Sequence, residues 1–238
     1  MSPAAAWRWC AVAGVATLLA SRGFGWIGAA QLCGPGYGDF SAVLSFEFAA
    51  SPAALDAMFG AEPCRGTMHA ALLRAQWWDA LAFIPAYTAF LVLGSGAASR
   101  VLWRPVVTAL ALLGGLLDEA EGLVMFAIMG ALPGSQWQFD LLGFIVQAKF
   151  IALAAGTAGI GALLLTHRRV IAAIPGAAMI AGGLTSLYAL ATMPNLWLMQ
   201  GLTYAWVALL IASVAGSVKP SLFSARAAPL PAPAPPSA

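Results

Sequence analysis

Charged residues are scarce in this chain. Of its 238 residues only 8% are Asp, Glu, Lys or Arg, and 61% are hydrophobic. Soluble globular domains carry about 25% charged residues, so this composition excludes that class. Several apolar runs exceed the roughly 18 residues that mark a candidate spanning helix. The sequence therefore predicts an integral membrane protein with the lipid bilayer as its partner, and a net charge of +2 is too small to indicate a nucleic-acid partner.

Histidines and catalytic motifs are also scarce. The two histidines, His69 and His167, lie at the ends of predicted spans, which argues against a buried haem or a multi-histidine metal site. The chain contains no phosphate-binding loop, no dinucleotide fingerprint and no G-x-S-x-G motif. No cofactor is expected from these patterns.

The apolar runs predict an all-α fold, a polytopic transmembrane helical bundle of about six spans. They are long and rich in Ala, Leu and Gly, without the alternation of barrel strands. A single domain is expected over residues 1–218, followed by a disordered, cytoplasmic, Pro/Ala-rich tail over 219–238. The predicted spans are Trp7–Leu32, His69–Leu93, Pro105–Leu132, Phe139–Leu165, Val170–Thr192 and Leu196–Gly216.

Basic residues predict the orientation of these spans. They occupy every second connection and both chain ends, whereas the opposite short connections, "LPGSQWQF" and "ATMPN", have none. Basic residues favour the cytoplasmic side, so both termini are predicted to be cytoplasmic in a bacterial inner membrane. In an alternative interpretation, Cys10–Ala20 is the apolar core of a cleaved signal peptide, which leaves five spans. The basic residues that carry the orientation are Arg8, Arg100, Arg104, Arg168, Arg169, Lys219 and Arg226.

One long connection, residues 33–68, is predicted on the extracytoplasmic side. Within it, Ser51, Pro52 and Gly60 have the spacing of an N-cap, a first helical residue and a C-cap, which predicts a short helix. Cys33 and Cys64 bracket the connection. In an oxidising compartment they can form a disulfide, and free thiols or a redox pair are the alternatives.

Three carboxylates interrupt the apolar run "LLGGLLDEAEGLVMF". Residues three apart on a helix lie about 60° from each other, so Asp118 and Glu121 share a face with two glycines, and Glu119 points elsewhere. An unpaired charge in lipid costs about 2.5–3.5 kcal/mol on the insertion scale. These carboxylates must therefore be paired, protonated, hydrated or bound to a cation.

Other ionisable residues are predicted at a similar depth in neighbouring spans. Asp79, Lys149 and Arg22 lie in the same slab of the bilayer as the two carboxylates of the third span. Tyr87 lies just beyond a kink expected at Pro85 and can donate a hydrogen bond to this group. Glu47 can reach its outer mouth if the apolar segment "AVLSFEFAA" dips inward. A structural interpretation pairs Lys149 with Asp118 or Glu121, and Arg22 with Asp79, only to fix helix register.

Three short segments carry a resemblance. "FEFA" (46–49), "WDALAFIPAY" (78–87) and "LLDEAEGL" (116–123) together resemble an uncharacterised family of bacterial polytopic membrane proteins with F-E-L-A and L-D-x-x-E-N motifs. The resemblance covers roughly residues 42–153. Phe48 and Gly122 stand where those proteins have Leu and Asn. It implies that Glu47, Asp79, Asp118 and Glu121 form one group, and it attaches no function to them.

Three functions follow as hypotheses. The first is a membrane protein that binds, and translocates, a proton, a cation or a small polar solute at these residues. The second is an enzyme in which Asp118 and Glu121 hold Mg²⁺ beside a lipid or isoprenoid phosphate, since carboxylate oxygens suit hard cations. The third is a structural or accessory subunit. The sequence leaves both a monomer and a homodimer open.

Overall fold

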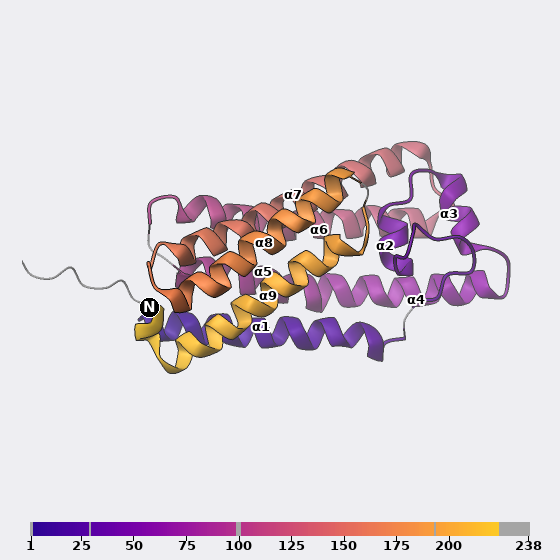
Figure 1. The fold of residues 1–238 in the computed structure, drawn as a ribbon. Helices are drawn as coiled ribbons and strands as arrows, with labels where there is room; N and C mark the ends of the chain where they lie inside the picture. The colour runs from indigo at the N-terminus through magenta and orange to yellow at the C-terminus, as the bar shows by residue number, and fades with distance from the viewer. Residues whose placement is uncertain (1, 29, 99–100, 193, 224–238) are drawn as a thin grey trace, which may run out of the picture.

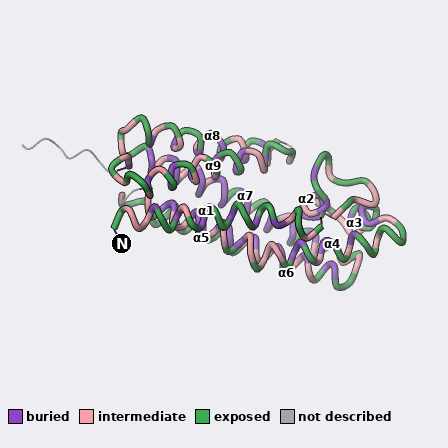
Figure 2. Tube along the Cα trace, turned by 90° about the horizontal axis from the view of Figure 1, so that it is seen from below, coloured by how far each residue is buried: buried purple, intermediate pink, exposed green. Residues whose placement is uncertain are grey.

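The chain folds into an elongated bundle of long helices that run along one axis (Figure 1). The computed structural model describes residues 2–28, 30–98, 101–192 and 194–223, and every regular element in these ranges is helical. The outward faces of the long helices are exposed and their inward faces are buried (Figure 2). The predicted all-helical fold is confirmed.

Eleven helical elements follow one another along the described residues. The segment Cys64–Ala98 is one continuous helix of 35 residues, although a π-helical turn, η1, interrupts its α-helical geometry. In chain order the elements are α1 (Pro3–Trp26), α2 (Ala42–Glu47), α3 (Pro52–Phe59), α4 (Cys64–Trp78), η1 (Asp79–Phe83), α5 (Ile84–Ala98), α6 (Arg104–Gly130), α7 (Gln136–Leu165), α8 (Val170–Thr192), α9 (Leu196–Val218) and η2 (Pro220–Phe223).

Five helical segments among the described residues are long and apolar enough to cross a membrane. They are α1, the continuous segment Cys64–Ala98, α7, α8 and α9. Helix α6 has 27 residues, which also suffices to span a bilayer, but Asp118, Glu119 and Glu121 interrupt its apolar sequence. The predicted span Pro105–Leu132 thus corresponds to the helix that carries the acidic residues.

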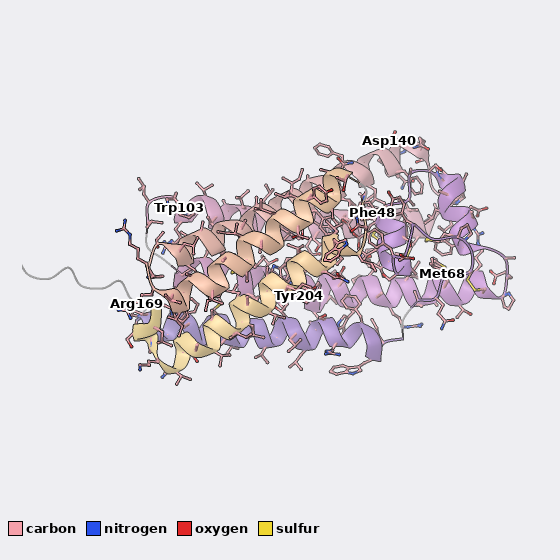
Figure 3. All side chains as sticks on the ribbon, viewed as in Figure 1. Phe48, Met68, Trp103, Asp140, Arg169 and Tyr204 are labelled. Atoms are coloured by element: carbon pink, nitrogen blue, oxygen red, sulfur yellow. A yellow bond between two sulfur atoms is a disulfide. The ribbon has the colours of Figure 1, made fainter. Side chains whose placement is uncertain are left out.

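The two ends of the described chain meet at one end of the bundle. The rings of Trp7 and Phe223 lie 4.8 Å apart between centroids, and Arg169 Nη1 donates a hydrogen bond to the carbonyl oxygen of Ser221 at 2.6 Å. Arg169 marks this end in Figure 3, and Asp140 marks the opposite end. The predicted basic flanks Arg100 and Arg226 lie outside the described residues. The other predicted basic residues lie at the start of α1 or α6, between α7 and α8, or at the end of α9, and these positions are all at this end of the bundle. They are Arg8, Arg104, Arg168, Arg169 and Lys219.

The first helix differs from its predicted bounds, Trp7–Leu32. It begins at Pro3, where Ser2 Oγ accepts a hydrogen bond from the backbone N–H of Ala5 at 3.3 Å. It ends at Trp26, and Gly28 then takes a φ of +86°, a left-handed conformation that glycine adopts without steric cost. Hydropathy could not show this end, because the apolar residues continue past it.

The C-terminal segment is also more ordered than predicted at its start. Residues Pro220–Phe223 form the 3₁₀ turn η2, and Phe223 is buried against Trp7. The physical reason is that the Phe223 side chain packs against Trp7, near the N-terminal end of α1, and both rings are buried there. The rest of the predicted tail, 224–238, lies outside the described residues.

The connection between α1 and α4 contains α2 and α3. The short helix predicted there is present as α3, with Ser51 Oγ accepting a hydrogen bond from the N–H of Ala54 at 3.2 Å and Gly60 at its C-cap with a φ of 59°. A disulfide joins Cys33 to Cys64. It ties the start of the connection to the first turn of α4, at the end of the bundle away from the chain termini.

Glycines let α7, α8 and α9 approach each other closely. A Cβ atom added at Gly161 of α7 would lie 2.5 Å from the carbonyl oxygen of Gly176 of α8. Between α8 and α9, a Cβ at Gly182 would collide with the carbonyl oxygen of Gly201. Small residues at helix interfaces allow such backbone contact, which contributes to helix association in lipid.

We expect Gly182→Ala to lower the thermal unfolding midpoint of the purified protein in detergent, because its methyl group would force α8 away from α9. Gly143→Ala is the control: a Cβ there meets no atom within 4 Å, and replacing a helical Gly by Ala favours the helix by about 0.5–1 kcal/mol. Fluorescence-monitored melting compares the two variants with wild type. If both variants melt together, close packing at Gly182 does not stabilise the bundle.

Candidate functional site

Glu47 enters the interior of the bundle from the connection between α1 and α4. It is the last residue of α2, and apolar neighbours hold it in place. Phe46 is fully buried, and the ring of Phe48 stacks on Phe150 of α7 with 6.1 Å between centroids. Burial of these rings carries the carboxylate inward, so that only 5% of Glu47 remains exposed.

Two more carboxylates come from the buried face of α6. Asp118 and Glu121 are 8% and 3% exposed, and Glu119 is only partly buried, as the helical spacing predicted. Helix α7 lies directly against this face, because a Cβ atom at Gly114 would be 2.5 Å from Leu153 of α7. Both carboxylates therefore point toward α7.

Lys149 of α7 lies at the centre of the three carboxylates. Its Nζ atom is 3.0 Å from Glu47 Oε2, 3.0 Å from Asp118 Oδ1 and 2.6 Å from Glu121 Oε2. The first two contacts are hydrogen bonds, whereas the third is an ion pair without hydrogen-bond geometry. The Nζ atom also lies 4.6 Å from the centroid of the Phe150 ring. We call Glu47, Asp118, Glu121 and Lys149 the Lys149 cluster.

Tyr87 extends this cluster toward α9. Its hydroxyl donates a hydrogen bond to Asp118 Oδ2 at 2.5 Å, so Asp118 binds both Lys149 and Tyr87. The Tyr87 ring stacks on Trp206 of α9 at 5.2 Å between centroids, and Trp206 Nε1 donates to Thr157 Oγ1 of α7 at 3.1 Å. Polar and aromatic contacts thus connect α5, α6, α7 and α9 around one carboxylate.

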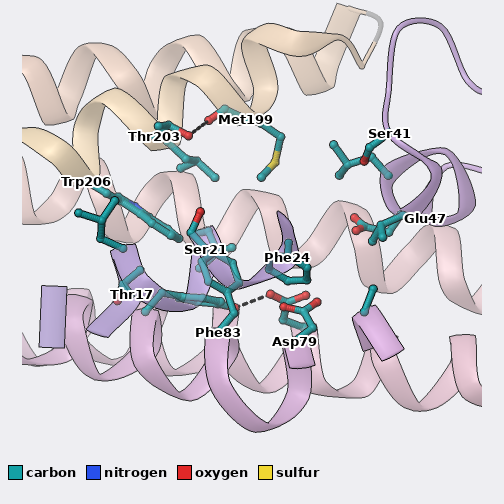
Figure 4. Close-up of a pocket in the computed structure, with 18 of the residues that line it drawn as sticks. Thr17, Ser21, Phe24, Ser41, Glu47, Asp79, Phe83, Met199, Thr203 and Trp206 are labelled. Carbon is teal, nitrogen blue, oxygen red and sulfur yellow. Dashed lines mark hydrogen bonds between the residues drawn. The ribbon is translucent and has the colours of Figure 1, made fainter. Parts of the chain in front are cut away.

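Asp79 stands at the start of the π-helical turn η1. The N–H of Ile84 donates to the carbonyl of Asp79, five residues earlier. Pro85 has no N–H and so leaves the carbonyl of Leu81 without its α-helical donor, which favours a change of helical geometry here. The Asp79 carboxylate makes no hydrogen bond or ion pair with any residue that the structure describes. Instead it lines a cavity together with Glu47, which lies at the loop side of the same space (Figure 4). Such π-helical turns are frequent at functional sites.

The charges of this region do not balance. When all groups are ionised, the cluster holds three negative charges and one positive charge, and Asp79 adds another negative charge nearby. Burying an ion costs several kcal/mol of desolvation free energy. The attraction between opposite charges offsets that cost only when each charge has a well-placed partner. Lys149 can neutralise one carboxylate, so the remaining acids have the capacity to hold a proton or a cation.

The predicted pairing of Arg22 with Asp79 is wrong. Arg22 is exposed on α1 and forms no ion pair with any described residue. The reason is the rotation of α1: Trp78 Nε1 donates to the carbonyl of Ala20 at 2.8 Å, and Gly23 packs against the same Trp78 ring. Arg22 follows Ala20 by 200° around the helix and therefore points away from α4. Arg22 and Asp79 lie at similar depths in their spans, but hydropathy does not show in which direction the Arg22 side chain points around α1.

The carboxylates suggested for Mg²⁺ face an ammonium group. Asp118 and Glu121 both contact Lys149 Nζ, which occupies the space between them. Within the described part of the chain, no group of three or more His, Cys, Asp or Glu side chains is arranged to hold a metal ion. The donor set as it stands suits the lysine better than a divalent cation.

One feature of the site, Trp206, was missed by sequence reasoning. Trp206 lies about ten residues into its predicted span, far from the ends where Trp residues anchor helices, and this position was the available signal. Gln76 is buried, and a Cβ at Gly122 would lie 2.6 Å from its amide nitrogen. A side chain at position 122 would therefore meet this amide from α4.

No protein-family model, curated protein or solved structure matches this chain. This agrees with the resemblance in the sequence, which has no function attached. The function must therefore be inferred from the chemistry of the Lys149 cluster and the cavity beside it.

We expect Lys149→Met to destabilise the protein strongly, because it leaves three buried carboxylates without their counter-charge. Removing one partner of a buried ion pair costs about 3–5 kcal/mol. The loss should be greater at alkaline than at acidic pH, since protonation removes the repulsion between the carboxylates. Thermal melting in detergent at both pH values measures the effect. The control is Lys219→Met, which removes an exposed charge at the end of α9. Equal melting of the two variants would contradict a stabilising role for Lys149.

Proposed function

We propose that this protein binds a proton, a cation or a small polar solute at the Lys149 cluster and moves it across a membrane. The observation that carries the proposal is the excess of buried carboxylates around one buried ammonium group. Ionisable residues inside a membrane protein are costly and usually mark a transport or proton pathway. A purely structural ion pair would need one acid, whereas Lys149 contacts three.

Competition for the carboxylate oxygens gives this site a way to respond to its ligand. A proton or cation on Glu47, Asp118 or Glu121 weakens the attraction of that carboxylate for Lys149. Glu47 belongs to α2, a short helix of the connection, and its ion pair with Lys149 ties that helix to α7. Ligand binding at Glu47 would therefore loosen α2, whose residues line the loop side of the cavity. The ion pair between Lys149 and Glu47 thus couples ligand binding at the cluster to the opening of the cavity on its loop side.

We place all six long helical segments across the bacterial inner membrane, with both termini in the cytoplasm. The inclusion of α6 is supported by its packing, because its two most buried carboxylates face α7 rather than lipid. The basic residues gathered at the end of the chain termini support the orientation. The disulfide between Cys33 and Cys64 at the opposite end suits an oxidising, extracytoplasmic side.

The first test measures the thermal stability of the purified protein while pH and added Na⁺, K⁺ or Mg²⁺ are varied. A ligand that binds the native state raises the melting midpoint by mass action. We expect the wild type to respond to protons as the pH is lowered through the neutral range, or to one of the cations. Asp118→Asn/Glu121→Gln should abolish that response.

The matched control is Glu119→Gln, which removes one carboxylate from the same helix but outside the cluster. It should respond to protons and cations as the wild type does. If the wild type responds to neither, or if the double variant responds equally, the cluster is not a binding site. Flux measurements in proteoliposomes with the same three proteins then separate binding from transport.

A further inference from the structure

A cavity of about 440 Å³ lies beside the Lys149 cluster. It is bounded by α1, α2, α4 with η1 and α5, α6, α7 and α9, and Figure 4 shows part of its wall. Binding sites for small organic molecules commonly measure about 300–1,000 Å³. A proton or a bare metal ion needs far less space, so the volume points to a larger occupant.

Most of the cavity wall is apolar. Aliphatic and aromatic side chains from α1, α5, α7 and α9 contribute to it, and Phe24 and Phe83 lie beside Asp79 (Figure 4). The Phe24 and Phe83 rings meet edge to face with 5.6 Å between centroids, and Trp206 stacks on Tyr87. Aromatic faces attract organic cations as well as hydrocarbon. The aromatic residues of the wall are Phe24, Phe83, Tyr87, Phe90, Phe150 and Trp206.

The polar part of the wall is acidic. Glu47, Asp79 and Asp118 line the cavity together with one cation, Lys149, which gives three negative charges to one positive charge when all are ionised. Glu47 and Asp118 already bind Lys149. Asp79 has no such partner among the described residues, and Figure 4 shows it beside Phe24 and Phe83 at the cavity. The wall therefore favours a positively charged group near Asp79.

The mouth of the cavity lies between α1 and α9. These helices touch near the chain termini, where a Cβ at Gly14 would meet Leu210 and one at Gly216 would meet Trp7. Farther along α1, toward α2, the two helices diverge (Figure 1), and residues of both line the cavity. Leu18 and Val207 line it and are 45% and 46% exposed. Both helices are long and apolar enough to cross a membrane, so in the proposed membrane arrangement this mouth faces lipid.

We infer that the cavity binds an amphiphilic organic cation, which enters from the lipid between α1 and α9 and places its charge against Asp79 and its hydrocarbon against the aromatic wall. This inference rests on the proposed function and names the class of solute that the site takes. The charge imbalance favours a cation over an anion, and the apolar wall and lateral mouth favour a lipophilic molecule over a hydrated one. Protons and the organic cation would then compete for the carboxylates of the cavity wall, Glu47, Asp79 and Asp118.

The test titrates the full-length protein in lipid nanodiscs with tetraphenylphosphonium, and empty nanodiscs correct for partition into the bilayer. Tetraphenylborate has nearly the same shape with the opposite charge and serves as the matched ligand. We expect saturable binding of the cation and none of the anion. Asp79→Asn should weaken cation binding by about tenfold or more, as expected when a desolvated charged partner is lost.

The mouth is tested with a pair of neighbouring substitutions. Leu18→Trp adds a large ring at a residue that lines the cavity and should weaken binding, whereas Leu19→Trp, at an exposed neighbour that does not line it, should bind as wild type does. Both positions are exposed, so folding should be retained. Glu119→Gln, again outside the cavity, should also bind normally.

Binding of the anion as tight as that of the cation would overturn the inference, as would wild-type affinity in both Asp79→Asn and Leu18→Trp. The proposed function fails separately. If the protein shows no saturable cation binding but keeps its proton or metal-ion response at Asp118 and Glu121, only the organic cation is wrong. If that response is also absent, both proposals fall.

Discussion

The architecture around the site depends on one ammonium group, which three carboxylates surround. Lys149 is the one buried cation among the residues that the structure describes, and its partners come from α2 and α6. Without Lys149 these acids would repel each other in a low-dielectric interior, where such interactions are strong. Without the acids the ammonium would be buried without a counter-charge. The contacts between α2, α6 and α7 therefore have to form together.

The packing of the other helices differs on the two sides of the Lys149 cluster. Glycines hold α7, α8 and α9 in close contact and leave little room between them. The opposite side is looser, because α1 and α9 separate beyond their contact near the chain termini and a cavity fills the space. The π-helical turn presents Asp79 to that cavity, while α2 presents Glu47 from the loop side. The closely packed helices and the open cavity thus meet at the Lys149 cluster.

Much of this arrangement could be predicted from the sequence, and the missing parts have physical causes. Helical periodicity placed Asp118 and Glu121 on one buried face, and capping residues located α3, because both signals are local. Depth along a span suggested Arg22 as a partner of Asp79, but hydropathy does not give the rotation of a helix, which Trp78 sets through a contact 58 residues distant in sequence. The cavity arises from the separation of α1 and α9, and the role of Trp206 arises from its contacts with α5 and α7. Both are tertiary properties that no local pattern encodes.

Lys149 holds Glu47, which comes from a short helix outside the long bundle helices, inside the bundle. A double-mutant cycle tests this contact most directly, with the thermal stability of Glu47→Gln, Lys149→Met and the double variant compared with wild type in detergent at one pH. We expect strong non-additivity, since residues in one ion-pair network couple by about 0.5–3 kcal/mol. The double variant should then be more stable than the sum of the two single losses implies. Strictly additive losses would mean that the two side chains do not interact and that Lys149 does not hold Glu47 in place.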